Sequence, residues 1–377
     1  MRIQSTVSAA TIAATVLVTR GSAAVPVTFS RDVQPILNAH CTNCHTPGGP
    51  APMSLVTYAD ATRWAAQIKD QTLRRRMPVW HAARGYGAFA NDPTLSPFEL
   101  AALASWVDGG TPPGQAHLPN AEPARPPNRG AIPAGTLTAL VRVRGGWATG
   151  WDFVPGDPLI SSARFTSADE SVIGTWTAGD PAVRLPSGSA VRVASPVTIE
   201  IWRRRPTEYE TPFTARPSSL RFTWLAATKE RPHPVPARRV WTEHLACGAT
   251  LGPTEATVIG VRPVLAAGAA AQITIERIGG AQPELLGWFR AFDPVYPRMY
   301  WLERPIDSAA NARLTSDAPC QLDVVLTGRR SQTGSPRAGR FVAPEATPCS
   351  DPCAGRAVRT RDADRATHPV AAGTDLR

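Results

Sequence analysis

Two cysteines and one histidine stand close enough together to bind a single group, in the segment Cys41-Thr42-Asn43-Cys44-His45. The spacing C-x-x-C-H is that of a covalently attached haem. The thiols of Cys41 and Cys44 can each form a thioether bond to one porphyrin, and His45 then supplies an axial imidazole to the iron. A zinc site would need two further ligands, and the chain has no second C-x-x-C and no H-x-x-x-H. The sequence therefore predicts one covalently bound haem c.

The iron of such a haem needs a sixth ligand, and the chain offers few thioethers. Its four methionines are Met1, Met53, Met77 and Met299, of which the first and last lie outside this part of the chain. Met53 follows His45 too closely for its loop to pass round the porphyrin. Met77 is followed by Pro78, which holds the backbone extended. Met77 is therefore the predicted ligand. His81 is the alternative, and Met77 could instead be an ordinary core methionine.

Three helices are expected to position these residues. The first begins at Ser30 and carries Leu37 on its apolar side as it runs into Cys41. The second extends from Tyr58 or Asp60 to about Arg76. The third begins with the capping-box pattern Ser96-Pro97-Phe98-Glu99 and stops at Gly109-Gly110. Helices that frame a C-x-x-C-H segment are typical of a small single-haem domain.

Four segments in this order carry a resemblance to a known family. They are Thr28 to Leu37, Cys41 to His45, Ala51 to Leu55, and Met77-Pro78-Val79-Trp80-His81. Together they resemble secreted bacterial single-haem cytochrome c domains with an MPPWH-like segment, over about a quarter of the chain. The resemblance implies an all-α haem domain in which the methionine of the last segment, here Met77, is the distal iron ligand.

From Leu137 onward the apolar pattern changes to a period of two, which is typical of half-buried strands. Examples are Val197, Ile199 and Ile201, and later Leu322, Val324 and Leu326. Short strands separated by Gly and Pro turns predict a β-sandwich, jelly-roll-like domain. This part is similar, faintly, to copper type II, ascorbate-dependent monooxygenases, as a degenerate relative. Two copper sites held mainly by imidazoles need more ligands than this domain has, so copper is not expected. The alternative is one residual copper at His233, His244 and Met299.

The predicted fold class is therefore multidomain, with an all-α cytochrome c domain followed by a mostly-β sandwich. The predicted divisions are a signal peptide at 1–24, the haem domain at 26–115, a Pro-rich linker at 116–135, the β-sandwich at 136–328 and a disordered tail rich in Arg, Pro and Ala at 329–377. The signal peptide is inferred from Arg2, an apolar run, and small residues near Ala24. The apolar run is short for a membrane span, and no later segment is apolar enough, so no integral membrane span is expected after its removal.

Four cysteines remain beside the haem pair, which suits two disulfides in an oxidising compartment. The first choice is Cys247 with Cys320 and Cys349 with Cys353, and the two other pairings stay open. Export and haem attachment agree on a periplasmic or secreted protein. The formal charge of +10 comes almost entirely from arginine. No nucleic-acid module is visible, and the charge favours docking to acidic periplasmic redox proteins.

These observations lead to an exported c-type cytochrome that transfers single electrons through one haem, with the β-sandwich for docking or binding. No catalytic residue is predicted, because an iron with six ligands has no vacant position for a substrate. One alternative is a haem-linked, copper-dependent monooxygenase-like enzyme, against which the shortage of histidines argues. Another is a structural or interaction protein in which the haem is incidental.

Overall fold

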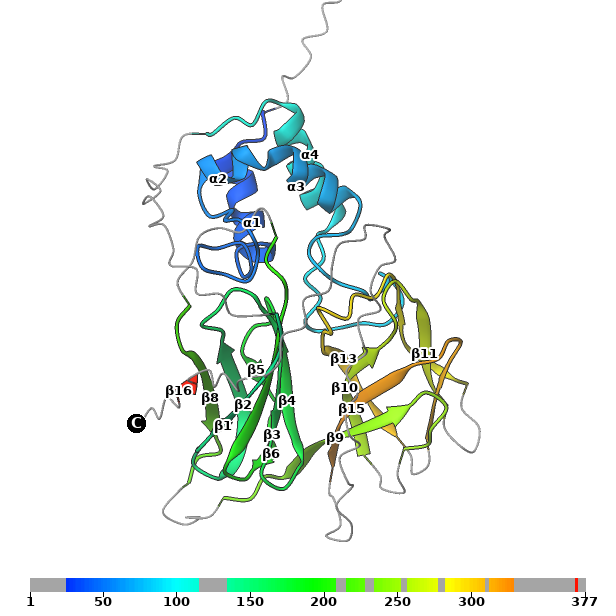
Figure 1. Cartoon of the computed structure of the whole chain (residues 1–377). Helices are drawn as coiled ribbons and strands as arrows, with labels where there is room; N and C mark the ends of the chain where they lie inside the picture. The colour runs from blue at the N-terminus through cyan, green and yellow to red at the C-terminus, as the bar shows by residue number, and fades with distance from the viewer. Residues whose placement is uncertain are drawn as a thin grey trace, which may run out of the picture.

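The computed structural model describes residues 25–114, 134–207, 215–227, 234–251, 256–276, 282–308, 312–328 and 370–371. Of the described residues, 40% are in strands and 15% are in helices, so the described fold is mostly β. Four α-helices gather at one end of the molecule, above two groups of strands that lie side by side (Figure 1). The predicted signal peptide, most of the predicted linker, and the predicted tail apart from 370–371 lie outside the described residues.

The helical elements sit between Phe29 and Asp108. They are a π-helical turn η1 (Phe29–Val33) and the helices α1 (Gln34–His40), α2 (Tyr58–Arg63), α3 (Ala65–Leu73) and α4 (Pro97–Asp108). The capping box is confirmed: the Ser96 hydroxyl accepts from the Glu99 backbone N–H at 3.2 Å, and the Glu99 carboxylate accepts from the Ser96 N–H at 2.7 Å. The single helix predicted from Tyr58 is two helices, because Trp64 leaves the helical conformation between them (φ −107°, ψ 13°).

The helices enclose a small core of their own, which we call the helical core. Its fully buried members include Phe29, Leu37, Leu103 and Trp106. Phe29 and Trp106 lie with ring centroids 5.9 Å apart, so the start of η1 packs against the end of α4. The backbone of Phe29 also donates to the Pro112 carbonyl at 2.9 Å. The two ends of the helical part are thereby held together, with α1 and the residues that follow it between them.

The described strands form three sheets. The elements are β1 (Gly135–Val141), β2 (Gly146–Val154), β3 (Ile160–Thr166), β4 (Val172–Thr177), β5 (Val183–Arg184), β6 (Ser189–Val193), β7 (Val197–Arg203), β8 (Ser218–Trp224), β9 (Arg238–Ala246), β10 (Ala256–Val264), β11 (Ala271–Glu276), β12 (Glu284–Phe289), β13 (Tyr300–Ser308), β14 (Arg313–Ser316), β15 (Gln321–Gly328) and β16 (Val370–Ala371). A large sheet has the order β13-β10-β15-β9-β6-β2-β8-β16, with β5 beside β2. The two smaller sheets are β1-β7-β3-β4 and β12-β11-β14. The large sheet therefore runs through both groups of strands, and β9 lies where the two groups meet (Figure 1).

Two apolar cores lie on opposite faces of the large sheet. The first β core lies between the large sheet and the sheet of β1, β3, β4 and β7. The second β core lies between the large sheet and the sheet of β11, β12 and β14. Strand β15 contributes to both: Val325 belongs to the first β core, while Val324 and Leu326 belong to the second. Strand β15 is accordingly buried at every position from Leu322 to Thr327. The predicted period-two strands are confirmed at β7, whose residues alternate between buried and half-buried.

A crossing segment, residues 77–92, leaves the helices and enters the second β core. Ala82 forms an antiparallel bridge with Phe289, and Phe89 forms one with Leu302. Backbone hydrogen bonds join Ala83 to the Trp288 carbonyl at 2.7 Å and Ala90 to the Trp301 carbonyl at 2.8 Å. Ala82 is buried in the second β core, with Phe89 packed against it. The helical part is thus tied into the strands by its own backbone.

The predicted fold class is wrong in its first half. No separate all-α domain is found among the described residues, because four short helices share their part of the chain with the crossing segment. The physical reason lies in residues 77–92, which contain proline, glycine and aromatic residues without a helical period. Such a segment buries aromatic side chains by pairing with strands and not by forming a helix.

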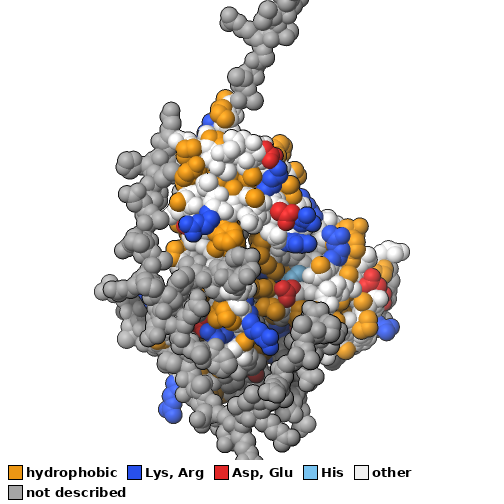
Figure 2. Space-filling model, turned by 45° about the horizontal axis from the view of Figure 1, so that its top comes forward, with side chains coloured by type: hydrophobic (Ala, Val, Ile, Leu, Met, Phe, Trp, Pro, Cys, Tyr) orange, Lys and Arg blue, Asp and Glu red, His pale blue; other side chains and the backbone are white. Residues whose placement is uncertain are grey.

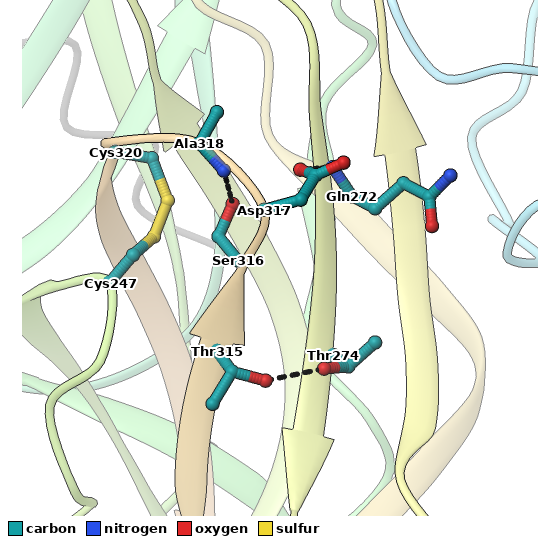
Figure 3. Close-up of a disulfide and its surroundings, with 8 residues drawn as sticks. All are labelled: Cys247, Gln272, Thr274, Thr315, Ser316, Asp317, Ala318 and Cys320. Atoms are coloured by element: carbon teal, nitrogen blue, oxygen red, sulfur yellow. Dashed lines mark hydrogen bonds between the residues drawn. A yellow bond between two sulfur atoms is a disulfide. The ribbon is translucent and has the colours of Figure 1, made fainter.

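One of the predicted disulfides is confirmed. Cys247 and Cys320 are bonded, with Cα atoms 5.3 Å apart, and they join the end of β9 to the start of β15. Figure 3 shows the bridge beside the turn that follows β14, where the Ala318 N–H donates to the Ser316 hydroxyl at 3.2 Å. The other predicted pair, Cys349 with Cys353, lies outside the described residues.

Candidate functional site

The C-x-x-C-H segment forms a tight turn directly after α1. The Cys41 N–H donates to the Leu37 carbonyl at 2.8 Å, so the cysteine closes the last turn of the helix. The Cys41 carbonyl then accepts from the N–H groups of Cys44 at 3.1 Å and His45 at 2.9 Å. These bonds fold the five residues back on themselves. The two thiols and the imidazole are consequently presented from one turn of backbone.

His45 is the best-positioned ligand of the three. Its side chain is 8% exposed, and Nδ1 lies 3.0 Å from the Met53 carbonyl. A histidine that ligates a metal commonly donates its second ring N–H to such a carbonyl, which fixes the tautomer and the ring orientation. Burial lowers the pKa of His45, so the imidazole is held neutral. No hydrogen-bond partner is found for Nε2 within the described part of the chain, which leaves that nitrogen available to bind a metal.

Cys41 and Cys44 are both free thiols, each half-buried. Burial, and then the neighbouring Cys44, raise the pKa of Cys41 to about 12. Burial also raises the pKa of Cys44, against the opposing effect of Arg298. Thiols with raised pKa values stay protonated at neutral pH and are poor nucleophiles. At neutral pH the pair is therefore two neutral thiols, held next to an imidazole.

Met77, the predicted sixth ligand, lies at the start of the crossing segment and is 38% exposed. Its backbone N–H donates to the Gln71 carbonyl at 3.2 Å, which anchors it to the end of α3. The thioether is not among the buried members of the helical core. Its role as an iron ligand stays a prediction, and the reading of Met77 as an ordinary core methionine is wrong.

His81, the alternative ligand, is fully engaged elsewhere. Its Nδ1 lies 3.1 Å from the Tyr300 hydroxyl, and its Nε2 accepts the Asp293 backbone N–H at 3.2 Å. Burial, with a smaller effect of the Arg298 charge, lowers its pKa to about 4. Because both ring nitrogens are hydrogen-bonded, His81 would have to break a bond to ligate a metal. The same holds for His40, whose ring nitrogens lie 2.9 Å from the Pro93 carbonyl and 3.0 Å from Glu99 Oε1.

Three residues in loops next to β4 and β13 also belong to this site, and sequence reasoning missed them. A Cβ atom placed on Gly179 would lie 2.4 Å from Cys44 Sγ and 3.4 Å from Arg298 Nη2. Gly179 also has a φ of +86°, which favours glycine. Next to it, Asp180 accepts from Arg298 Nη1 at 2.6 Å. The turn after β4 thus approaches the cysteine closely. No local pattern marks these residues, because they lie more than a hundred positions from Cys44.

The residual copper site is not formed by the described residues. His244 lies on β9 with Nδ1 2.7 Å from Asp323 Oδ1, in a buried group with Arg262. Met299 is packed in the first β core. His233 lies outside the described residues. Within the described residues, no group of three or more His, Cys, Asp or Glu side chains could hold a metal ion.

The comparisons with known proteins give no family. No protein-family model matches the chain, and no curated protein matches it. Among solved structures, the major capsid protein P2 from Bacteriophage PM2 is similar at 10% identity and a TM-score of 0.28, covering 54% of this chain and 95% of its own. The regulatory domain of Toxoplasma gondii PKA with cAMP is similar at 12% identity and a TM-score of 0.13, covering 51% of this chain and 77% of its own. At these scores neither likeness carries an argument.

The family resemblance drawn from the sequence is therefore wrong. A chain that is mostly strand, with four short helices among the described residues, is not a secreted cytochrome c domain followed by a copper monooxygenase-like module. The structure likewise gives no support to a classification as a haem-binding cytochrome c, because the described residues contain no metal site. What remains is a chemical hypothesis about five residues. A covalent attachment motif depends on its local geometry and not on the fold that carries it.

Two observations bear on where the chain resides. The Cys247–Cys320 disulfide is of the kind that persists in oxidising compartments. Among the described helices, none has the length and apolar character needed to cross a bilayer.

Proposed function

We propose that this chain transfers single electrons through one haem attached covalently to Cys41 and Cys44, with His45 as an axial ligand. The observation that supports this best is the geometry of His45, whose Nδ1 is held by the Met53 carbonyl while Nε2 has no partner among the described residues. The haem would supply an iron that cycles between Fe(III) and Fe(II). The residues of the chain bind it, orient it and limit the access of water.

Each residue of the turn has a separate task in this proposal. The backbone bonds from Cys44 and His45 to the Cys41 carbonyl fix the spacing of the two sulfurs and the imidazole. The Met53 carbonyl keeps the proton of His45 on Nδ1, so Nε2 would bind the iron as a neutral ligand. The thioether of Met77 is the proposed sixth ligand. It is not buried in the helical core, so it can turn towards an iron without leaving a cavity there.

We also propose that the protein works in the periplasm or outside the cell, where its disulfide is stable. Its partners would be acidic redox proteins, attracted by the net charge of +10. On the face seen in Figure 2, basic side chains are mixed with acidic and apolar ones. This face therefore does not present a single basic docking patch. We propose instead that the net charge attracts acidic partners at long range.

The test is the visible spectrum of the exported protein, produced together with haem-attachment machinery. We expect a low-spin, six-coordinate spectrum that is lost in the His45→Ala variant, with a weak thioether-to-iron charge-transfer band. Met77→Ala should remove that band, whereas Met53→Leu, a matched change at the other methionine near the turn, should leave it in place. A high-spin wild-type protein would contradict the carrier proposal. A band that survives Met77→Ala would remove Met77 from the site.

A further inference from the structure

A buried ion pair between two loops of the β part lies beside the C-x-x-C-H turn. Arg298, in the loop that leads into β13, is 7% exposed. Its Nη1 donates to Asp180 Oδ1 at 2.6 Å, and its Nη2 donates to the Ala178 carbonyl at 2.8 Å. Its Nε has no partner among the described residues. The guanidinium is therefore buried, held in a fixed position, and only partly neutralised by hydrogen bonds within the chain.

Asp180 is fixed from two sides. Besides accepting from Arg298, its carboxylate accepts from the Thr177 backbone N–H at 2.8 Å. Its own N–H donates to the Thr177 carbonyl at 2.8 Å, which closes the turn after β4. The pair therefore links the end of β4 to the start of β13. Neither partner can move far without breaking a buried hydrogen bond, so their charges have fixed positions relative to the turn.

The sulfur of Cys44 lies close to this pair. A Cβ atom on Gly179 would be 2.4 Å from Cys44 Sγ and 3.4 Å from Arg298 Nη2, so the two atoms lie within about 6 Å of one another. At this range and in a buried setting, a charge acts strongly on its neighbour. Asp180 follows Gly179 directly in the chain and is bonded to Arg298, so both charges of the pair lie near this sulfur.

We propose that Arg298 and Asp180 set the reduction potential of the haem attached at Cys44, with Arg298 raising the potential and Asp180 lowering it. This inference rests on the proposed function. Reduction of Fe(III) removes one positive charge from the group, so a fixed positive charge nearby favours Fe(II) and a fixed negative charge favours Fe(III). Because both residues are buried, solvent and salt screen them weakly. Charges in the β part of the molecule would thereby shift the reduction potential of a haem bound by the helical part.

The experiment is a redox titration of the purified, haem-loaded full chain. Arg298→Gln should shift the midpoint potential down, and Asp180→Asn should shift it up. Arg298→Lys keeps the charge and should stay close to the wild type. Arg221→Gln, which removes an arginine from the exposed Arg221–Asp152 pair, is the matched control and should leave the potential unchanged. If the pair had only a structural role, the shifts in midpoint potential of Arg298→Gln and Asp180→Asn would not have opposite signs.

Three results separate the possible failures. A wild-type protein that takes up no haem defeats the proposed function itself. Full haem content with unchanged potentials, or with shifts of the same sign in Arg298→Gln and Asp180→Asn, defeats only the role of the pair. If either single variant fails to fold, the double variant Arg298→Gln with Asp180→Asn removes both buried charges together. Its potential should lie above that of Arg298→Gln or below that of Asp180→Asn, whichever single variant folds, because the two losses of charge act in opposite directions. The reverse order would overturn the inference.

Discussion

At the scale of single residues, the environment of each histidine decides its role. His45 has one ring nitrogen on the Met53 carbonyl and the other without a partner among the described residues. His81 has both ring nitrogens bonded, to the Tyr300 hydroxyl and to the Asp293 N–H. His45 therefore has the arrangement of a metal ligand, and His81 has the arrangement of a structural histidine. Sequence spacing alone left His81 open as an iron ligand, and the hydrogen bonds argue against it.

His81 should make the stability of the protein depend on pH. Burial lowers its pKa to about 4 from the ordinary value of about 6.5, so the unfolded chain binds the proton more tightly than the folded chain. The contribution of neutral His81 is therefore fully present above pH 6.5 and is lost as the pH falls towards 4. The full difference is about 3 kcal/mol. Urea unfolding between pH 4.5 and 7.5 measures it.

The control for this prediction is His81→Gln, which removes the titrating group. In this variant the unfolding free energy should change less with pH than in the wild type over the same range. Equal slopes in the two proteins would show that His81 does not carry the dependence. His45 is also buried with a lowered pKa, so some slope should persist in the variant while no metal is bound.

At the scale of elements, the crossing segment is the connection that the sequence did not reveal. Residues 77–92 start at the end of α3 and add backbone bridges to β12 and β13. Phe89 packs against Phe289 and Tyr300, with ring centroids 6.2 Å and 5.2 Å away. The helical part and the second β core therefore share side chains. We expect them to unfold together rather than as independent domains.

Phe89→Ala tests this sharing. Removing a half-buried aromatic ring from the second β core should lower the unfolding free energy by about 2 kcal/mol, less than for a fully buried phenylalanine. Phe98→Ala is the matched control, because that side chain lies on α4 and is 87% exposed, and it should change stability by less than about 0.5 kcal/mol. The measurement is denaturant unfolding followed by helical circular dichroism and by tryptophan fluorescence. Two separate transitions in the wild type would contradict the coupling.

At the scale of the whole molecule, the large sheet has an apolar core on each face. The sequence predicted strands wherever one face is buried, as at β7, because alternation is then visible. It also predicted β15, from Leu322, Val324 and Leu326, but it did not show that this strand is buried on both faces, with Val325 in the first β core. It could not predict that Arg298 and Asp180 lie beside Cys44, because contacts between distant segments leave no local pattern. It did predict the capping box of Ser96 and Glu99 at the start of α4, which depends on neighbouring residues.

The Cys247–Cys320 disulfide closes a loop across the second β core. The two residues are 73 positions apart, and a cross-link of that span should stabilise the fold by about 4 kcal/mol through the entropy of the unfolded chain. The variant Cys247→Ser with Cys320→Ser should therefore unfold at lower denaturant concentration, with the difference measured under non-reducing conditions. Adding a reductant should lower the midpoint of the wild type and leave the double variant unchanged. A wild type insensitive to reductant would show that the bond contributes nothing.

The most direct test of the central proposal is the mass of the peptide that contains residues 41–45, recovered from protein exported in the presence of haem-attachment machinery. We predict that this peptide carries one porphyrin, bonded through both sulfurs and resistant to extraction with acidified solvent. The Cys41→Ala with Cys44→Ala variant should yield the same peptide without any adduct. Recovery of the wild-type peptide with two unmodified thiols, or with a disulfide between them, would contradict the account.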